Sequence, residues 1–281
     1  MQVHTLRYWL FGIALTLPLM ASGCGEGGSV IEDTGLPQAV QDAISAGLDE
    51  VEVPVMEEVA GVVKPTGLST IFHIDYASPV EEAHLINQAQ TDCGDASSYK
   101  KLSHKWTSFP VTFSIDTTNV TQNTDPEAAK NAVVNAFNTW DAEQHPNTPF
   151  FTEASSSQTP KVTVKWQPID RQGGTLAYAS TTYYILSKAA VSSRVVYDSG
   201  DKWWVFKDSS CDKQDNASAF DIEDVGAHEI GHVVGLGHTS KSSSYRPLTM
   251  YPYILHVGET LKRTLGTGDR KGLAAIYQIN Q

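Results

Sequence analysis

The segment from residue 228 to residue 238 constrains this chain more than any other, and it has the sequence HEIGHVVGLGH. His228 and His232 are one helical turn apart, so both imidazole rings can point to the same spot beside a helix. Gly235 has no Cβ, which allows a sharp turn, and His238 then returns to that spot. Three neutral His around zinc leave one position for water, which is typical of a catalytic site. Glu229 can reach that water, so the pattern predicts a metal centre with a general base.

This pattern resembles the signature of the metzincins, which are zinc peptidases. Met250, twelve residues after His238, lies in the segment LTMYPY, which resembles the tight Met-turn beneath the metal in that family. The Met-Tyr-Pro order is similar to the matrixin branch, the matrix metalloproteinases and their bacterial relatives. The resemblance implies a metalloendopeptidase in which His228, His232 and His238 hold one catalytic zinc and Glu229 is the base.

The resemblance extends over residues 100–277 and implies an α+β fold. The metzincin catalytic domain is a twisted, mostly parallel sheet with an antiparallel edge strand, two long helices and a C-terminal helix. The segment GGTLAYA is similar to the matrixin edge strand that holds substrate. A protein or peptide substrate is therefore expected to lie extended along Leu176 and Ala177, adding a strand to the sheet. Pro252 and Tyr253 are expected to wall the pocket for the residue after the cut.

Local patterns predict the order of the elements. Alternating apolar residues predict strands over 111–115 and 162–166, and 176–181 and 194–198 are further strand candidates. Asp125 and Pro126 are typical of a helix start, and the helical spacing runs to Trp140. Asp221 starts a second helix that ends near Gly235, and a last helix is expected from about Thr267. Residues 36–48 have a helical apolar spacing, whereas the pattern over 51–95 supports no assignment.

Two departures from the matrixin pattern concern further metals. Matrixins hold a second, structural zinc partly through two His, where this chain has Tyr178 and Val196, so we expect a single zinc. Asp198 and Asp201 fall where that family binds calcium, and carboxylate oxygens suit this ion. The other interpretation of these two residues is a pair of solvated surface carboxylates.

The first residues are typical of an export signal. Arg7 precedes an apolar run from Leu10 to Met20 that is too short to span a bilayer, so residues 1–23 are predicted to be a signal peptide. The Ala-Ser-Gly-Cys that follows resembles the lipobox of bacterial lipoproteins. This resemblance implies a lipid on Cys24 that holds the protein at the outer membrane or cell surface, with plain secretion as the alternative.

Residues 24–99 are predicted to be an acidic tether, a linker or a prosegment ahead of a peptidase domain over 100–281. Between Glu26 and Glu82 there are 12 acidic residues and one basic residue, Lys64, a net charge of −11 out of −12 for the whole chain. The remainder is nearly neutral. The composition therefore offers no basic surface for nucleic acid.

Cys93 and Cys211 are left once Cys24 is assigned to a lipid. In an exported protein a disulfide between the two is the first expectation. The alternative comes from the resemblance, because matrixins are made as zymogens in which a prosegment Cys followed by Gly binds the zinc. Cys93 and Gly94 lie where that switch is expected, although the flanking residues differ from those of the family.

A surface lipoprotein that acts as a binding or adhesion module and retains a zinc site is the competing function. Glu229 distinguishes the two, because a binding protein needs no base beside its metal.

Overall fold

The computed structural model describes residues 36–59, 62–77, 95–121, 124–142, 150–170, 172–207 and 218–278. The predicted signal peptide, Cys24, Cys93 and Cys211 lie outside these ranges. Among the residues in these ranges, no helix is long and apolar enough to cross a membrane.

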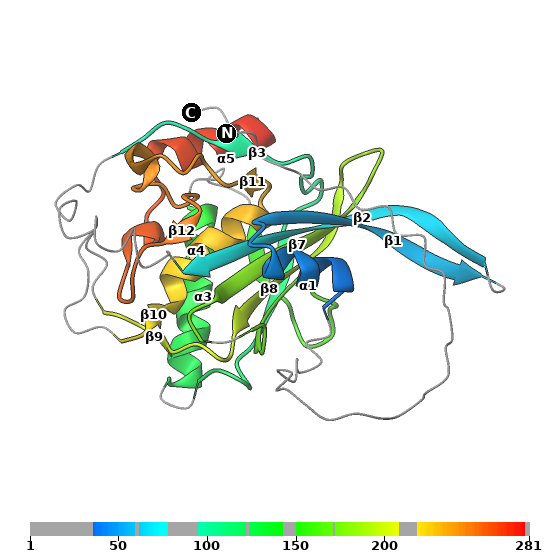
Figure 1. Ribbon diagram of the computed structural model, residues 1–281. Helices are drawn as coiled ribbons and strands as arrows, with labels where there is room; N and C mark the ends of the chain where they lie inside the picture. Colours follow the sequence, from blue (N-terminus) through cyan, green and yellow to red (C-terminus); the bar gives the residue numbers. More distant parts are fainter. Residues whose placement is uncertain are drawn as a thin grey trace, which may run out of the picture.

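Eight strands of the described chain form one twisted sheet (Figure 1). Its parallel part contains β4 (Val111–Asp116), β5 (Phe151–Glu153), β6 (Val162–Gln167) and β8 (Ala190–Asp198). Strand β7 (Thr175–Tyr184) is antiparallel to β8. These strands include all four that the sequence predicts, and β5 is the short one that it misses.

Three helices complete the predicted architecture: α3 (Pro126–Asp141), α4 (Ile222–Val233) and the C-terminal α5 (Thr267–Tyr277). The Asp125 side chain caps α3 by accepting from the Ala128 N–H, and Asp221 caps α4 in the same way through the Asp224 N–H. Apolar residues of α3 and α4 pack with the inward residues of the strands in one large core. The α+β fold expected from the resemblance is confirmed.

The N-terminal segment extends this sheet beyond β7. It contains α1 (Gln38–Ser45), as the helical spacing predicts, followed by the hairpin of β1 (Glu50–Val59) and β2 (Val62–Ala77). Strand β2 pairs antiparallel with β7, so the sheet order is β1-β2-β7-β8-β6-β4-β5. The expected edge strand β7 is thus covered along its length by residues that precede the predicted peptidase domain.

Helix α1 packs on the face of the sheet opposite to α3 and α4. Side chains alternate between the two faces of a strand, and Tyr178 and Val196 point away from the main core. They form a second apolar cluster with Val40 and Ala43 of α1 and Ile74 of β2. Helix α1 therefore packs over the two positions where the resemblance expects zinc-binding His.

The remaining elements are short. Strand β3 (Lys100–Lys101) pairs with β11 (Leu236–Gly237), and β9 (Trp203–Trp204) pairs with β10 (Phe220–Asp221). Strand β12 (Tyr253–Ile254) runs parallel to the end of β2. Two single-turn 3₁₀ helices, η1 (Ser243–Tyr245) and η2 (Leu261–Arg263), flank β12 in the chain.

Candidate metal centre and its groove

Helix α4 carries His228, Glu229 and His232 into the interior, where all three are at most 1% exposed. The helix can lie this deep because Gly231 has no side chain: a Cβ there would come within 2.1 Å of the Met250 sulfur. After the helix, Gly235 adopts a φ of +102°, which favours glycine, and the chain turns back toward His238.

The three His rings meet at one point through their Nε2 atoms. The His238 Nε2 lies 3.1 Å from the Nε2 of His228 and 3.1 Å from that of His232. Nitrogen ligands about 2.05 Å from a tetrahedral zinc are roughly 3.3 Å apart. The spacing of the three nitrogens is therefore close to that of zinc ligands.

The opposite ring nitrogens fix the orientation of these rings. The Nδ1 of His228 faces the Thr249 carbonyl, and the Nδ1 of His232 lies 2.8 Å from the Leu236 carbonyl. Carbonyls only accept hydrogen bonds, so each Nδ1 carries the proton and each Nε2 offers a lone pair to the common point. The Nδ1 of His238 lies 3.8 Å from the Asp49 carboxylate.

Burial keeps two of the rings in the neutral form that binds metals. It lowers the pKa of His228 to about 3 and also lowers the pKa of His232. For His238 burial acts in the same direction, but the carboxylates of Asp75 and Asp49 raise its pKa to about 9. A proton and a metal ion therefore compete for His238.

Asp75 of β2 is the fourth side chain at this point. Its Oδ1 lies 2.9 Å from the Nε2 of His228 and 2.7 Å from that of His238, and its Oδ2 lies 3.6 Å from the Nε2 of His232. One ligand atom from each of these four residues lies within 4.8 Å of all the others. His73, two residues earlier on β2, stacks on the His232 ring with a centroid distance of 4.3 Å.

Glu229 lies beside this cluster with its carboxylate fully buried. Within the described residues neither of its oxygens has a hydrogen-bond partner, and the same holds for the Oδ2 of Asp75. Burial, followed by the charge of Asp75, raises the pKa of Glu229 well above its usual range. Two buried carboxylates and three convergent Nε2 atoms fit a divalent cation, and Nε2 donors with a carboxylate oxygen suit zinc.

Met250 lies in a turn that packs against helix α4, and Asp269 of α5 holds that turn. The Asp269 carboxylate accepts hydrogen bonds from the Thr249 N–H at 2.9 Å and the Met250 N–H at 3.2 Å. The Met250 sulfur packs against Gly231 of the His-bearing helix.

The residues expected to bind substrate are neighbours of β2 in the structure. Ala177 of β7 is opposite Asp75 in the strand register, and the neighbouring Leu176 is fully buried. On the other side, Tyr253 pairs with Tyr76 of β2, and Pro252 is buried. At Tyr76 strand β2 therefore lies between β7 and β12, whereas from His73 back to Val62 its neighbour on that side is β1.

Asp198 and Asp201 lie away from this centre and are not solvated, because both are 0% exposed. The Asp198 carboxylate accepts from the backbone N–H groups of Ile169 and Gly200, and Asp201 accepts from that of Gly173. Burial raises the pKa of Asp201 to about 7. Its Oδ2 has no hydrogen-bond partner within the described residues.

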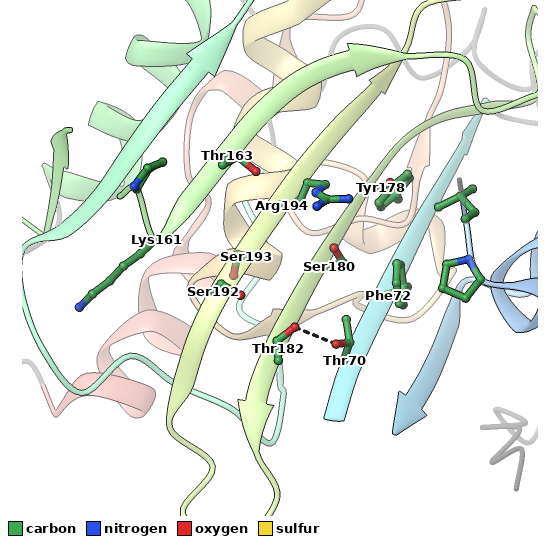
Figure 2. Close-up of a pocket in the computed structure, with 13 residues that line it drawn as sticks. Thr70, Phe72, Lys161, Thr163, Tyr178, Ser180, Thr182, Ser192, Ser193 and Arg194 are labelled. Atoms are coloured by element: carbon green, nitrogen blue, oxygen red, sulfur yellow. Dashed lines mark hydrogen bonds between the residues drawn. The ribbon is translucent and has the colours of Figure 1, made fainter. Parts of the chain in front are cut away.

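The outer face of the sheet has a shallow cavity of about 400 Å³ between the strands and the start of α1 (Figure 2). Thr70, Tyr178 and Arg194 are among its lining residues. Residues of this face alternate with Asp75 and Ala177, so the cavity and the His cluster lie on opposite sides of the sheet.

The sequence analysis did not identify Asp75, Asp49 or Asp269 as site residues. A signal for Asp75 exists in the segment Leu68–Ala77, where His73 and Asp75 alternate with the apolar Phe72 and Ile74. Nothing local to Asp49 or Asp269 marks them, because their partners are more than 100 and about 20 residues away in the chain, respectively.

Comparison with known proteins gives one family. A family model described as Matrixin matches residues 105–278. Metalloendoproteinase 1 of Glycine max is 33% identical over 163 residues, which are 54% of this chain and 46% of that protein. Matrix metalloproteinase-25 of Homo sapiens is 32% identical over 111 residues, 39% of this chain and 17% of the relative. Karilysin of Tannerella forsythia is 26% identical over 156 residues, 53% of this chain and 28% of the relative. The chain thus spans less than half the length of these relatives.

Proposed function

Because the chain belongs to the matrixin family of peptidases, we propose that it is a zinc-dependent endopeptidase that uses His228, His232 and His238 as ligands and Glu229 as general base. The observation that carries the proposal is the convergence of three His Nε2 atoms on one buried point beside the buried carboxylate of Glu229. A binding module that retains zinc has no need of that carboxylate.

Zinc, when bound, lowers the pKa of a water molecule and polarises a peptide carbonyl. The remaining steps belong to the side chains of this protein. Glu229 accepts the proton of the water as it attacks the carbonyl carbon, and then gives that proton to the leaving amine. The raised pKa of Glu229 makes its carboxylate a stronger base for the first of these steps. The buried position of the carboxylate limits exchange of the proton with bulk solvent.

The substrate is proposed to be an extended peptide that pairs with β7 in place of β2, which holds those backbone groups in the structure. Leu176 and Ala177 present their backbone on one side, and Pro252 and Tyr253 form the other wall. Backbone pairing of this kind binds any extended sequence, so selectivity rests on the pocket beside β12.

Calcium is proposed as a second, structural ion at Asp198 and Asp201. The unpartnered, buried Oδ2 of Asp201 supports this, because a cation offsets the cost of burying a carboxylate.

Cys24 is proposed to carry the lipid anchor, so the protein acts at the outer membrane or cell surface. A disulfide is proposed between Cys93 and Cys211. These last two proposals rest on the sequence alone.

The test of the peptidase function compares Glu229→Gln, His232→Ala and the control Glu223→Gln, which changes a carboxylate on the same helix that faces Asn135. Zinc content and cleavage of a quenched peptide library are measured on each protein, before and after limited proteolysis. We expect Glu229→Gln to retain one zinc and lose nearly all turnover, and His232→Ala to lose both. Turnover of Glu229→Gln near that of Glu223→Gln would show that the base is assigned wrongly. Zinc without turnover in every sample would favour a binding module.

A further inference from the structure

We infer that Lys262 is a positioning residue of the metal centre: its buried ammonium lies against the carbonyl that holds the ring of His228, and it thereby sets how strongly this ring binds the metal. This inference rests on the proposed function and deepens it, because it concerns the strength of one ligand of the same site. Its consequence is that the charge of Lys262 makes a bound zinc easier to lose but a stronger Lewis acid.

The ammonium of Lys262 is buried against backbone carbonyls. The residue is 0% exposed, and its Nζ donates to the Tyr251 carbonyl at 2.8 Å and to the Thr249 carbonyl at 3.4 Å. Among the described residues these two carbonyls are its only hydrogen-bond partners. Burial of a charged side chain is costly, and an apolar side chain of the same length would fill this space at a lower cost. The charge itself therefore needs an explanation.

Two buried carboxylates balance this charge without taking its hydrogen bonds. Asp224 of α4 accepts from the backbone N–H of Lys262 at 2.6 Å, and Glu259 accepts from the Leu255 N–H at 2.5 Å. Burial, followed by the charge of Glu259, raises the pKa of Asp224 well above its usual range, and the charge of Lys262 opposes this rise. The interior thus keeps a positive charge here, while the hydrogen bonds of that charge go to the turn over residues 248–251.

The chain fixes Lys262 between this turn and the start of α4. Arg263, the next residue of η2, donates to the two oxygens of Asp221 at 2.8 and 2.6 Å. The Thr249 hydroxyl donates to the Lys262 carbonyl at 3.2 Å. Because α4 also carries His228, the ammonium, the turn and the ring are held on one helix.

The Thr249 carbonyl is shared between Lys262 and His228. The Nδ1 of His228 donates to this oxygen, against which the ammonium also lies. A cation beside an acceptor draws electron density from it, so the oxygen attracts the Nδ1 proton less strongly. The outer partner of a ligating His raises the basicity of the ring, and a weakened partner therefore leaves a weaker ligand. The Leu236 carbonyl, which holds the ring of His232, accepts from no ammonium within the described residues.

The first experiment tests the shared carbonyl without any activity assay. The proton resonances of the His Nδ1–H groups are recorded in intact, zinc-loaded protein labelled with nitrogen-15 in His, for the parent, Lys262→Met, Lys262→Arg and the control Lys271→Met, whose position is exposed on α5. Loss of the charge should strengthen the bond from His228 and move its resonance downfield in Lys262→Met alone, while that of His232 stays in place. An unchanged His228 resonance in Lys262→Met would overturn the inference.

The second experiment measures zinc loss to excess chelator from the same four proteins. Removal of the charge should slow the loss about tenfold in Lys262→Met, while Lys262→Arg and Lys271→Met stay near the parent. A residue that only held the turn together would give the opposite sign, because a loosened turn releases zinc faster. If Lys262→Met does not fold, Lys262→Gln decides, since its amide can still donate to a carbonyl but has no charge. A faster or equal loss in the uncharged variant would contradict the inference.

Peptide cleavage by these proteins, before and after limited proteolysis, separates this inference from the proposed function. We expect kcat to fall about tenfold in Lys262→Met, with KM near that of the parent, and to be restored in Lys262→Arg. A parent that cleaves peptides, with an unmoved His228 resonance and an unchanged zinc loss in Lys262→Met, would overturn the inference and leave the peptidase function standing. A moved resonance and a slower zinc loss without turnover in any sample would leave the role of Lys262 at the metal standing and overturn the peptidase function.

Discussion

Replacement of Asp269 tests how the fold holds the metal centre from below. This side chain is 1% exposed and accepts three backbone hydrogen bonds, from Thr249 and Gly266 at 2.9 Å each and from Met250 at 3.2 Å. The Thr249 carbonyl in turn faces the Nδ1 of His228. One carboxylate on α5 therefore fixes the Met-turn and, through it, the orientation of one ring in the cluster.

The expected cost follows from the number of donors left without an acceptor. A buried N–H that loses its acceptor costs about 1–3 kcal/mol. Asp269→Ala leaves three such groups without their acceptor. It also removes a carboxylate whose burial is itself unfavourable, as its raised pKa indicates, and this offsets part of the cost. We therefore expect a loss of about 3–5 kcal/mol in the free energy of unfolding, out of the 5–15 kcal/mol typical of a domain. In Asp269→Asn the amide oxygen can still accept hydrogen bonds from the Thr249 and Gly266 N–H groups. The Met250 N–H is then unpaired, so we expect a loss of about 1–3 kcal/mol in the free energy of unfolding.

Urea unfolding followed by Trp fluorescence measures this loss, and the rate of zinc loss to a chelator measures the effect on the centre. The matched control is Asp95→Ala, because the Asp95 carboxylate also accepts a backbone hydrogen bond at the start of α5 but is exposed. We expect the control to cost at most about 1 kcal/mol. An Asp269→Ala variant as stable as the control, with unchanged zinc retention, would refute the role of Asp269 in holding the turn.

Three further predictions follow from other contacts. Gly231→Ala puts a Cβ 2.1 Å from the Met250 sulfur and should destabilise the protein by about 1–3 kcal/mol in thermal unfolding; an unchanged Tm would contradict this packing. Added calcium should raise the Tm of the parent but not that of Asp201→Asn, and an equal rise in both would exclude Asp201 as a ligand. Cys24→Ser should move the protein from the membrane fraction to the soluble fraction, and unchanged membrane association would count against the lipid anchor.

The elements that the sequence predicts well are those with a strong local pattern. The caps Asp125 and Asp221 mark the starts of α3 and α4, and the alternating apolar residues mark β4 and β6. The convergence of His228, His232 and His238 is also local, since all three lie within eleven residues.

The contacts that the sequence does not predict depend on pairing between distant segments. Asp75 meets the His cluster only because β2 pairs with β7, about 100 residues later, in one particular register. A shift of that register by one residue would turn Asp75 to the outer face and Ile74 to the metal. The alternation of Phe72 and Ile74 with His73 and Asp75 is consistent with a strand but does not fix this register, so the contact with the centre could not be assigned.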